Sequence, residues 1–187
     1  MSEKSAPSDR ALSGPFDASE VSPVQPFIDL GAIRVRPRQG MQLRLDIEQS
    51  NKKLISATLE LSGSTLQLQA FAAPKNEGIW DEIRTGIAEQ IDKQGGSVDQ
   101  VVGPFGPEIA AEIPAGNGEK RKVRFIGVDG PTWFLRGVIT GLAAENRRNA
   151  AEIEDVFRTA VVDRGTAPLP PRELLQLTVP PQPGMEQ

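Results

Sequence analysis

The chain has 187 residues, which is enough for one domain with its own hydrophobic core and leaves no room for a second large one. It contains no cysteine, histidine or tyrosine, so a disulfide framework, a thiolate metal site and most familiar catalytic groups are excluded. A net charge of -4 argues against general attraction to phosphate, and nucleic acid is therefore not an expected partner.

Residues 1–26 are rich in proline and serine and show little apolar periodicity. Such a segment buries too little apolar surface to offset the entropy that it would lose on ordering. We therefore expect a disordered N-terminal arm over 1–26, followed by a single α+β domain over 27–165.

Alternating apolar residues predict three successive strands, over 41–48, 55–61 and 65–72. A polar turn separates the first two, and Ser62-Gly63 suits a tight hairpin between the second and the third. The outward positions are polar, so these strands are expected to form an antiparallel meander that needs a cover on its apolar face.

The next segment carries four isoleucines at a constant spacing of four residues. They are Ile79, Ile83, Ile87 and Ile91. This spacing is typical of an amphipathic helix, which would supply the cover. Asn76 is the expected N-cap of the helix, and Gly95-Gly96 is its expected end.

Further strands are expected over 97–102, 107–113, 122–128 and 132–140. The last of them is apolar on both faces, which indicates a central strand that is covered on both sides. Apolar residues at helical spacing then predict a second helix over 149–163. The predicted fold class is α+β, with a mainly antiparallel sheet of about six to seven strands packed with two helices.

Prolines return over 166–187 and predict an extended C-terminal tail. Within this tail, the segment 173–179 alternates Leu175, Leu177 and Val179 with polar residues. The segment is expected either as a short strand docked on its own domain or as a peptide that docks on a partner.

Two stretches are candidate partner-binding sites, and the first is a loop with two Gly-Pro steps. It consists of Gly103, Pro104, Phe105, Gly106 and Pro107. So stiff a loop would hold Phe105 in one direction, and the ring would serve a partner as an aromatic anchor. The alternative is a rigid connection between strands in which Phe105 caps the core.

The second candidate is a basic run at the start of an expected strand. It consists of Lys120, Arg121, Lys122 and Arg124. On a hairpin these side chains would form a local positive patch. The alternative is a set of solvated charges that prevent strands of different molecules from pairing edge to edge.

Catalysis would have to use Asp or Glu together with Lys, Arg, Ser or Thr, and no spacing of the acidic residues marks such a group. We therefore predict no catalytic residue, no metal site and no cofactor. No apolar run is long enough to span a bilayer, and the first residues lack the apolar stretch of a signal peptide. We expect a cytoplasmic protein without membrane insertion.

Several motifs occur together in an order and spacing that are familiar. They are FAAP at 71–74, GIWDEI at 78–83, Gly95-Gly96, the loop 103–108 and VDGPTWFLRG at 128–137. Together they resemble the actinobacterial family named domain of unknown function 3710, which implies no established activity, cofactor or catalytic residue. More distantly, the order of the elements is similar to the Mog1/PsbP-like fold, an α/β/α sandwich found mostly in adaptor and accessory proteins.

The missing catalytic residue types and the flexible ends favour a non-enzymatic interaction or accessory module, adaptor-like in character, with a protein as its partner. One alternative is a small-ligand-binding domain or a carboxylate-dependent enzyme. A third is a weak nucleic-acid binder that uses the run from Lys120 to Arg124. The sequence does not predict an oligomeric state.

Overall fold

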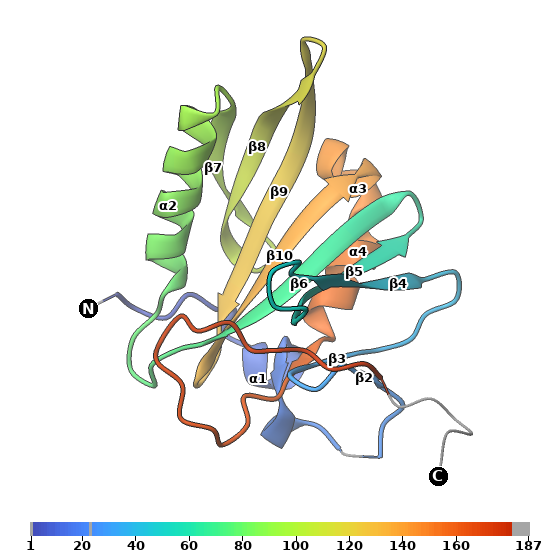
Figure 1. Ribbon diagram of the computed structural model, residues 1–187, viewed down its shortest axis with the longest axis vertical. Helices are drawn as coiled ribbons and strands as arrows, with labels where there is room; N and C mark the ends of the chain where they lie inside the picture. The colour runs from blue at the N-terminus through green and yellow to red at the C-terminus, as the bar shows by residue number, and fades with distance from the viewer. Residues whose placement is uncertain (1, 23, 181–187) are drawn as a thin grey trace.

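The computed structural model describes residues 2–22 and 24–180, and its largest element is a seven-stranded antiparallel sheet (Figure 1). The strands lie in the order β4-β5-β6-β10-β9-β8-β7. They are β4 (Gln42–Ile47), β5 (Leu54–Leu61), β6 (Ser64–Ala72), β7 (Ser97–Gly103), β8 (Gly106–Gly116), β9 (Glu119–Asp129) and β10 (Trp133–Gly141). The predicted α+β class is confirmed, and β10 lies at the centre of the sheet, as its two apolar faces predicted. The β8–β9 hairpin is longer than expected and projects at the top of Figure 1.

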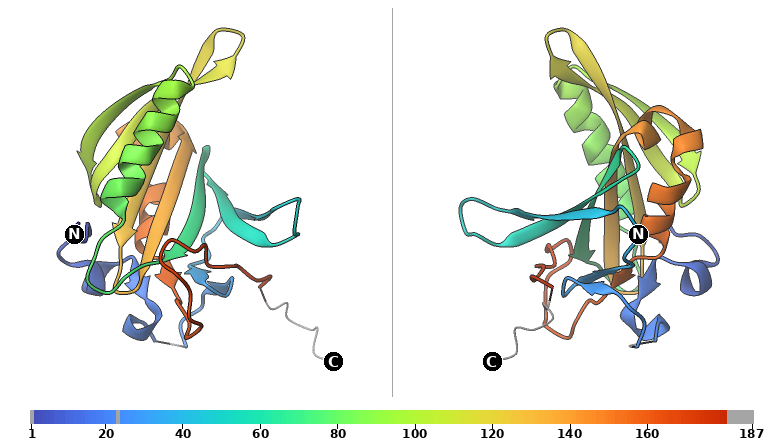
Figure 2. Two further views of the ribbon diagram at one scale, coloured as in Figure 1. Left: turned by 60° about the vertical axis from the view of Figure 1, so that its left-hand side comes forward. Right: turned by 90° about the vertical axis from the view of Figure 1, so that its right-hand side faces the viewer.

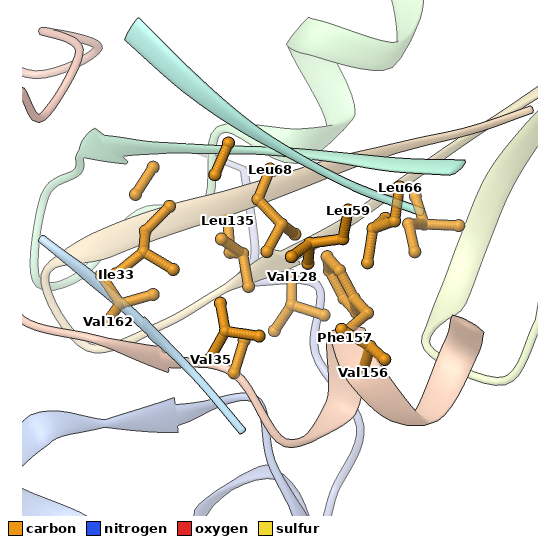
Figure 3. Packing of buried hydrophobic residues seen from close by; sticks show 14 of the residues in the cluster. Ile33, Val35, Leu59, Leu66, Leu68, Val128, Leu135, Val156, Phe157 and Val162 are labelled. Atoms are coloured by element: carbon orange, nitrogen blue, oxygen red, sulfur yellow. The ribbon is translucent and has the colours of Figure 1, made fainter. Parts of the chain in front are cut away.

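Alternate residues of the sheet point to one face and build the main core there (Figure 3). Leu66 and Leu135 contribute from neighbouring strands and are fully buried. The helix α4 (Ala151–Arg158) covers them with Val156 and Phe157, which are also buried. Each fully buried side chain of this size stabilises the fold by about 1.5–3 kcal/mol, so this layer accounts for much of the stability.

The helix α2 (Trp80–Lys93) lies on the opposite face, over β7, β8 and β9 (Figure 2). Phe134, the neighbour of Leu135, points to this side, and its ring stacks on Trp80 with 5.3 Å between ring centroids. The amphipathic helix is therefore confirmed. None of the helices within residues 2–22 and 24–180 combines the length and the apolar character needed to cross a membrane.

The expected N-cap of this helix is wrong. The helix begins at Trp80, and Ile79 rather than Asn76 occupies the N-cap position, without a side-chain cap of its own. The backbone N–H of Ile79 instead donates to Oδ1 of Asp129, at 3.0 Å, from the distant end of β9. A carboxylate at the end of a strand thus accepts from a free backbone N–H at the start of the helix. No local sequence pattern could indicate this contact.

The helix expected over 149–163 is also shorter than the spacing predicted. It ends at Arg158, and Val161–Val162 forms the short strand β11 of a second sheet, in the order β1-β11-β3-β2. Two β-branched residues in a row suit a strand better than a helix. The other members of this sheet are β1 (Phe16–Asp17), β2 (Ile28–Asp29) and β3 (Ile33–Val35). The remaining short helical elements are α1 (Arg10–Ser13), η1 (Ala18–Glu20), α3 (Leu142–Glu145) and η2 (Arg147–Asn149).

The N-terminal segment differs from the expected flexible arm, because residues 2–22 lie against the domain. The backbone N–H of Phe16 donates to the carbonyl of Ala160 at 2.9 Å, and β1 pairs in parallel with β11. Gly14 approaches the carbonyl of Arg158 so closely that a Cβ would lie 1.8 Å from that oxygen. These contacts use main-chain groups, which hydrophobic periodicity does not register.

The C-terminal segment docks on its own domain along the end of β6 and beside β5. Leu175 and Leu177 are buried, and the backbone N–H of Leu175 donates to the carbonyl of Ala70 at 2.8 Å. The pairing consists of isolated bridges, not of a continuous strand. Val179 remains 63% exposed. The part of the expected tail over 181–187 lies outside the described residues.

Candidate functional site

The face of the sheet that α2 partly covers also carries a row of polar side chains, on strands that lie beside those under α2. This polar row consists of Asp46, Ser56, Thr58, Gln67, Gln69 and Arg136, from β4, β5, β6 and β10. Gln67 Nε2 donates to Ser56 Oγ at 3.1 Å, and Arg136 Nη2 donates to Gln69 Oε1. Hydrogen bonds thus link side chains of neighbouring strands across this face.

Asp46 closes the row at the β4 end. Its Oδ2 accepts hydrogen bonds from the hydroxyls of Ser56 and Thr58, each at 2.7 Å. Burial alone would raise the pKa of Asp46, but these two hydrogen bonds and the one from Arg44 outweigh it, so the pKa lies below its usual value. The carboxylate is therefore held in its charged form.

Arg136 closes the row at the β10 end, and its surroundings are unusual for an arginine. Among the described residues no carboxylate forms a salt bridge with it, and its buried Nε has no hydrogen-bond partner. Burial lowers the pKa of Arg136 below its usual value. The guanidinium lies 5.9 Å from the ring centroid of Phe71. A partly buried positive charge without a counter-charge is costly, and an anion would offset that cost.

Arg136 lies in the wall of a groove of about 380 Å³ between α2 and the sheet. The lining from α2 includes Ile83, Ile87 and Ile91, and the sheet contributes Phe125 among others. Gly86 lies on the exposed side of α2 at the rim, and a Cβ there would meet no atom within 4 Å. The groove therefore joins an apolar wall to one positive charge.

The Gly-Pro loop forms the turn between β7 and β8, where Gly103 pairs with Gly106. Phe105 is 2% exposed and packs edge-on against Phe157, with 4.7 Å between ring centroids. The guanidinium of Arg158 lies 4.9 Å from the same ring. The loop thus holds Phe105 in one direction, as expected, but that direction is inward. Pro104 stays exposed, and Pro107 accepts a hydrogen bond from Trp80 Nε1.

The basic run does not form one patch. Lys120, Arg121 and Lys122 are exposed on the first part of β9, whereas Arg124 is buried. Arg124 binds Glu108 through two hydrogen bonds, of 2.8 and 3.0 Å, and Glu154 through one of 3.0 Å. Burial alone would lower the pKa of Arg124, but these two carboxylates outweigh it and raise the pKa.

This cluster of Glu108, Arg124 and Glu154 joins β8, β9 and α4, and sequence reasoning missed it. The only signal was the alternation in β9, which places Arg124 on the same face as the apolar Ile126. Within residues 2–22 and 24–180, no three acidic side chains gather in a way that could hold a metal ion.

The fold and the groove define an α+β protein with helices on both faces of an antiparallel sheet and an open, apolar, positively charged groove. The family model described as "Protein of unknown function (DUF3710)" matches residues 14–186, and the chain belongs to this family. A protein of Granulibacter bethesdensis named N-(5'-phosphoribosyl)anthranilate isomerase is 28% identical over 170 residues, which cover 85% of this chain and 76% of that protein. No solved structure matches the chain, so the likeness to the Mog1/PsbP-like fold stays a prediction.

Proposed function

We propose that the protein is a non-enzymatic interaction module, and that the groove beside Arg136 binds a partner segment with a carboxylate among apolar side chains. The observation that carries this proposal is the arginine itself, whose Nε has no partner and which no described carboxylate neutralises. The isoleucines of α2 favour apolar side chains next to that carboxylate.

The length of the groove favours a stretch of polypeptide as the occupant. Its lining runs along α2 from Ile83 to the C-cap residue Gln94. At 1.5 Å per helical residue this distance is about 16 Å, which is the length of about five extended residues. A compact ligand would occupy only part of such a groove, so we favour a peptide over the alternative of a small molecule.

The charge preference can be tested with labelled pentapeptides that carry a central Glu between leucine, isoleucine or phenylalanine residues, and with counterparts that carry Gln. We expect the Glu peptides to bind about tenfold more tightly, since a hydrogen bond to a charged group contributes about 1.5–3 kcal/mol. Fluorescence anisotropy measures the affinities, and NMR of arginine Nε–H groups should show the Arg136 resonance moving on titration.

Two variants sharpen this test. Arg136→Gln should abolish the difference between the Glu and Gln peptides, whereas Arg44→Gln, on the same face with a side chain that is 72% exposed, should preserve it. Equal affinity for the two peptide classes, or the absence of binding to both, would contradict the proposed groove.

The name of the Granulibacter relative supplies a second candidate function, an isomerase that acts on N-(5'-phosphoribosyl)anthranilate. Without histidine, cysteine or tyrosine, proton transfer would depend on carboxylates and lysines, and the carboxylates Glu108 and Glu154 are already bound to Arg124. Conversion of this substrate by the purified protein, followed through the change in anthranilate fluorescence, would favour the enzyme over the interaction module.

A further inference from the structure

The first residues of the chain lie beside the end of β9 and the segment that leads into α2 (Figure 1). Residues 74–78 and 129–131 form the surface that they contact, and we call this surface the strap site. We call residues 2–5 the N-terminal strap. Gly78 N–H donates to the carbonyl of Ser2 at 2.9 Å, and Asp129 N–H donates to the carbonyl of Ser5 at 2.9 Å. The N–H of Ser5 returns a hydrogen bond to Oδ2 of Asp129, also at 2.9 Å. The strap is held mainly through its backbone, as an extended peptide is held in a recognition groove.

One side chain of the strap is recognised specifically. Lys4 Nζ donates to three main-chain carbonyls, those of Pro74 at 3.0 Å, Gly130 at 2.5 Å and Pro131 at 2.9 Å. We call these three oxygens the carbonyl cage. An ammonium group has three N–H donors and no acceptor, so the cage matches its hydrogen-bonding capacity in full.

The charge of Lys4 is partly compensated in the cage. Burial alone lowers the pKa of Lys4, and the nearby Asp129 carboxylate offsets a part of this effect without cancelling it. A neutral side chain of similar length would leave the three carbonyls without donors, which indicates a preference for an ammonium group.

The cage is built by contacts that do not depend on the strap. Asp129 Oδ1 binds Ile79 N–H, and Gly130 N–H donates to the carbonyl of Trp133 at 2.8 Å. Gly78 gives the strap room, because a Cβ at that position would lie 2.3 Å from the carbonyl oxygen of Glu3. These two hydrogen bonds position Asp129 and Gly130 without any contribution from residues 2–5.

The cage and its occupant also come from different parts of the chain. The cage residues lie inside the range 14–186 that matches the family model, and residues 2–5 lie outside it. We infer that the strap site is a binding site for an extended, lysine-bearing segment, that this chain fills it with its own strap, and that a lysine-bearing segment of a partner protein competes with the strap. This site shares no residue with the groove beside Arg136 and stands independently of the function proposed for that groove.

A tethered segment has an effective concentration in the millimolar range, so the full chain should bind a free peptide only weakly. The test uses the full chain with Lys4→Glu, which removes the ammonium, and a labelled peptide with the sequence of residues 2–9 as the probe. We expect this peptide to bind Lys4→Glu at least tenfold more tightly than the wild type. Lys75→Glu is the matched control, since it makes the same charge change beside the cage on an exposed residue.

Hydrogen exchange at the amides of Gly78 and Asp129 reports whether the strap has left the strap site, because both amides donate to strap carbonyls. Three results together support the inference: these amides exchange faster in Lys4→Glu, the labelled peptide binds this variant, and a peptide with methionine in place of lysine binds it much more weakly. Unchanged exchange, absence of binding after the strap has opened, or equal binding of the lysine and methionine peptides overturns it. A wild-type dimer at high concentration that Lys4→Glu abolishes would assign the strap site to a second copy of the chain and would also overturn the proposed partner segment.

Discussion

Trp133 Nε1 donates a hydrogen bond of 2.8 Å to Oδ1 of Asp17, and this contact joins the central strand β10 to the N-terminal segment. Asp17 also caps η1 by accepting from the backbone N–H of Ser19 at 3.1 Å. Burial alone would raise the pKa of Asp17, but the hydrogen bonds from Ser19 and Trp133 and the charge of Arg10 outweigh it and lower the pKa. The folded protein therefore favours the ionised carboxylate.

Removing this carboxylate should destabilise the fold measurably. Asp17→Ala deletes a helix cap and leaves the buried indole N–H without its acceptor, so we expect the free energy of unfolding to fall by about 1–3 kcal/mol. Urea denaturation followed by circular dichroism measures this change. Asp9→Ala is the control, because Asp9 occupies the N-cap of α1 without a side-chain hydrogen bond. Equal losses in the two variants would contradict a specific role for the contact with Trp133.

The free energy of unfolding should also fall in acid, because two aspartates have a lowered pKa in the folded protein. Asp17 and Asp46 both have a lowered pKa in the folded state, so their contribution is complete above the unfolded pKa of about 3.9 and is lost as the pH falls through the folded values. We expect urea midpoints that hold steady near neutrality and decline below about pH 4. Asp46→Asn should make this decline shallower, and an unaltered pH profile would contradict the assignment.

The buried cluster around Arg124 predicts a large effect of one substitution. Arg124→Met leaves Glu108, 2% exposed, without its partner and should lower the free energy of unfolding by about 3–5 kcal/mol. The double variant Arg124→Met with Glu108→Gln should recover part of this loss, since the more deeply buried carboxylate is then neutral and only Glu154, with a side chain that is 18% exposed, keeps a charge without its partner. Lys122→Met, two residues away and exposed, should change stability by less than about 0.5 kcal/mol. Chemical denaturation of the four proteins, wild type included, completes the comparison.

Phe105 distinguishes the two interpretations of the Gly-Pro loop. As a core residue, Phe105→Ala should cost about 3–5 kcal/mol of unfolding free energy. Val102→Ala, on the same hairpin with a side chain that is 77% exposed, should cost less than about 0.5 kcal/mol. A small effect of Phe105→Ala on thermal and urea unfolding would restore the ring as a candidate anchor for a partner.

Two glycines around α2 should respond in opposite ways to the same substitution. Gly86 lies within α2, and a Cβ there would meet no neighbouring atom. Gly86→Ala should stabilise the protein by about 0.5–1 kcal/mol, because glycine loses more backbone entropy on folding than alanine does. Gly95 has φ +83°, so Gly95→Ala should destabilise it. A fall in melting temperature for Gly86→Ala would mean that the rim of the groove is filled.

The sheet and both main helices could be predicted from the sequence because their apolar residues repeat at the period of the element. The apolar residues on both faces of 132–140 predicted even the central place of β10. By contrast, the helix predicted over 149–163 was too long, because a run of apolar residues does not show where a helix gives way to a strand. The position of Arg136 in a groove depends on the distant α2, and the contact of Asp129 with Ile79 depends on a carboxylate 50 residues away. Such relationships arise only when the chain is folded.

The chain has two tryptophans, and each indole N–H is engaged in a different region, Trp80 with the Pro107 carbonyl at 2.8 Å and Trp133 with Asp17. Replacing either one by phenylalanine would leave a single tryptophan, which would then dominate the intrinsic fluorescence. Trp80 alone would report on the packing of α2 against the β7–β8 hairpin. Trp133 alone would report on the attachment of the N-terminal segment. The protein thus carries two optical reporters, which can show whether these regions separate from the sheet together or one after the other.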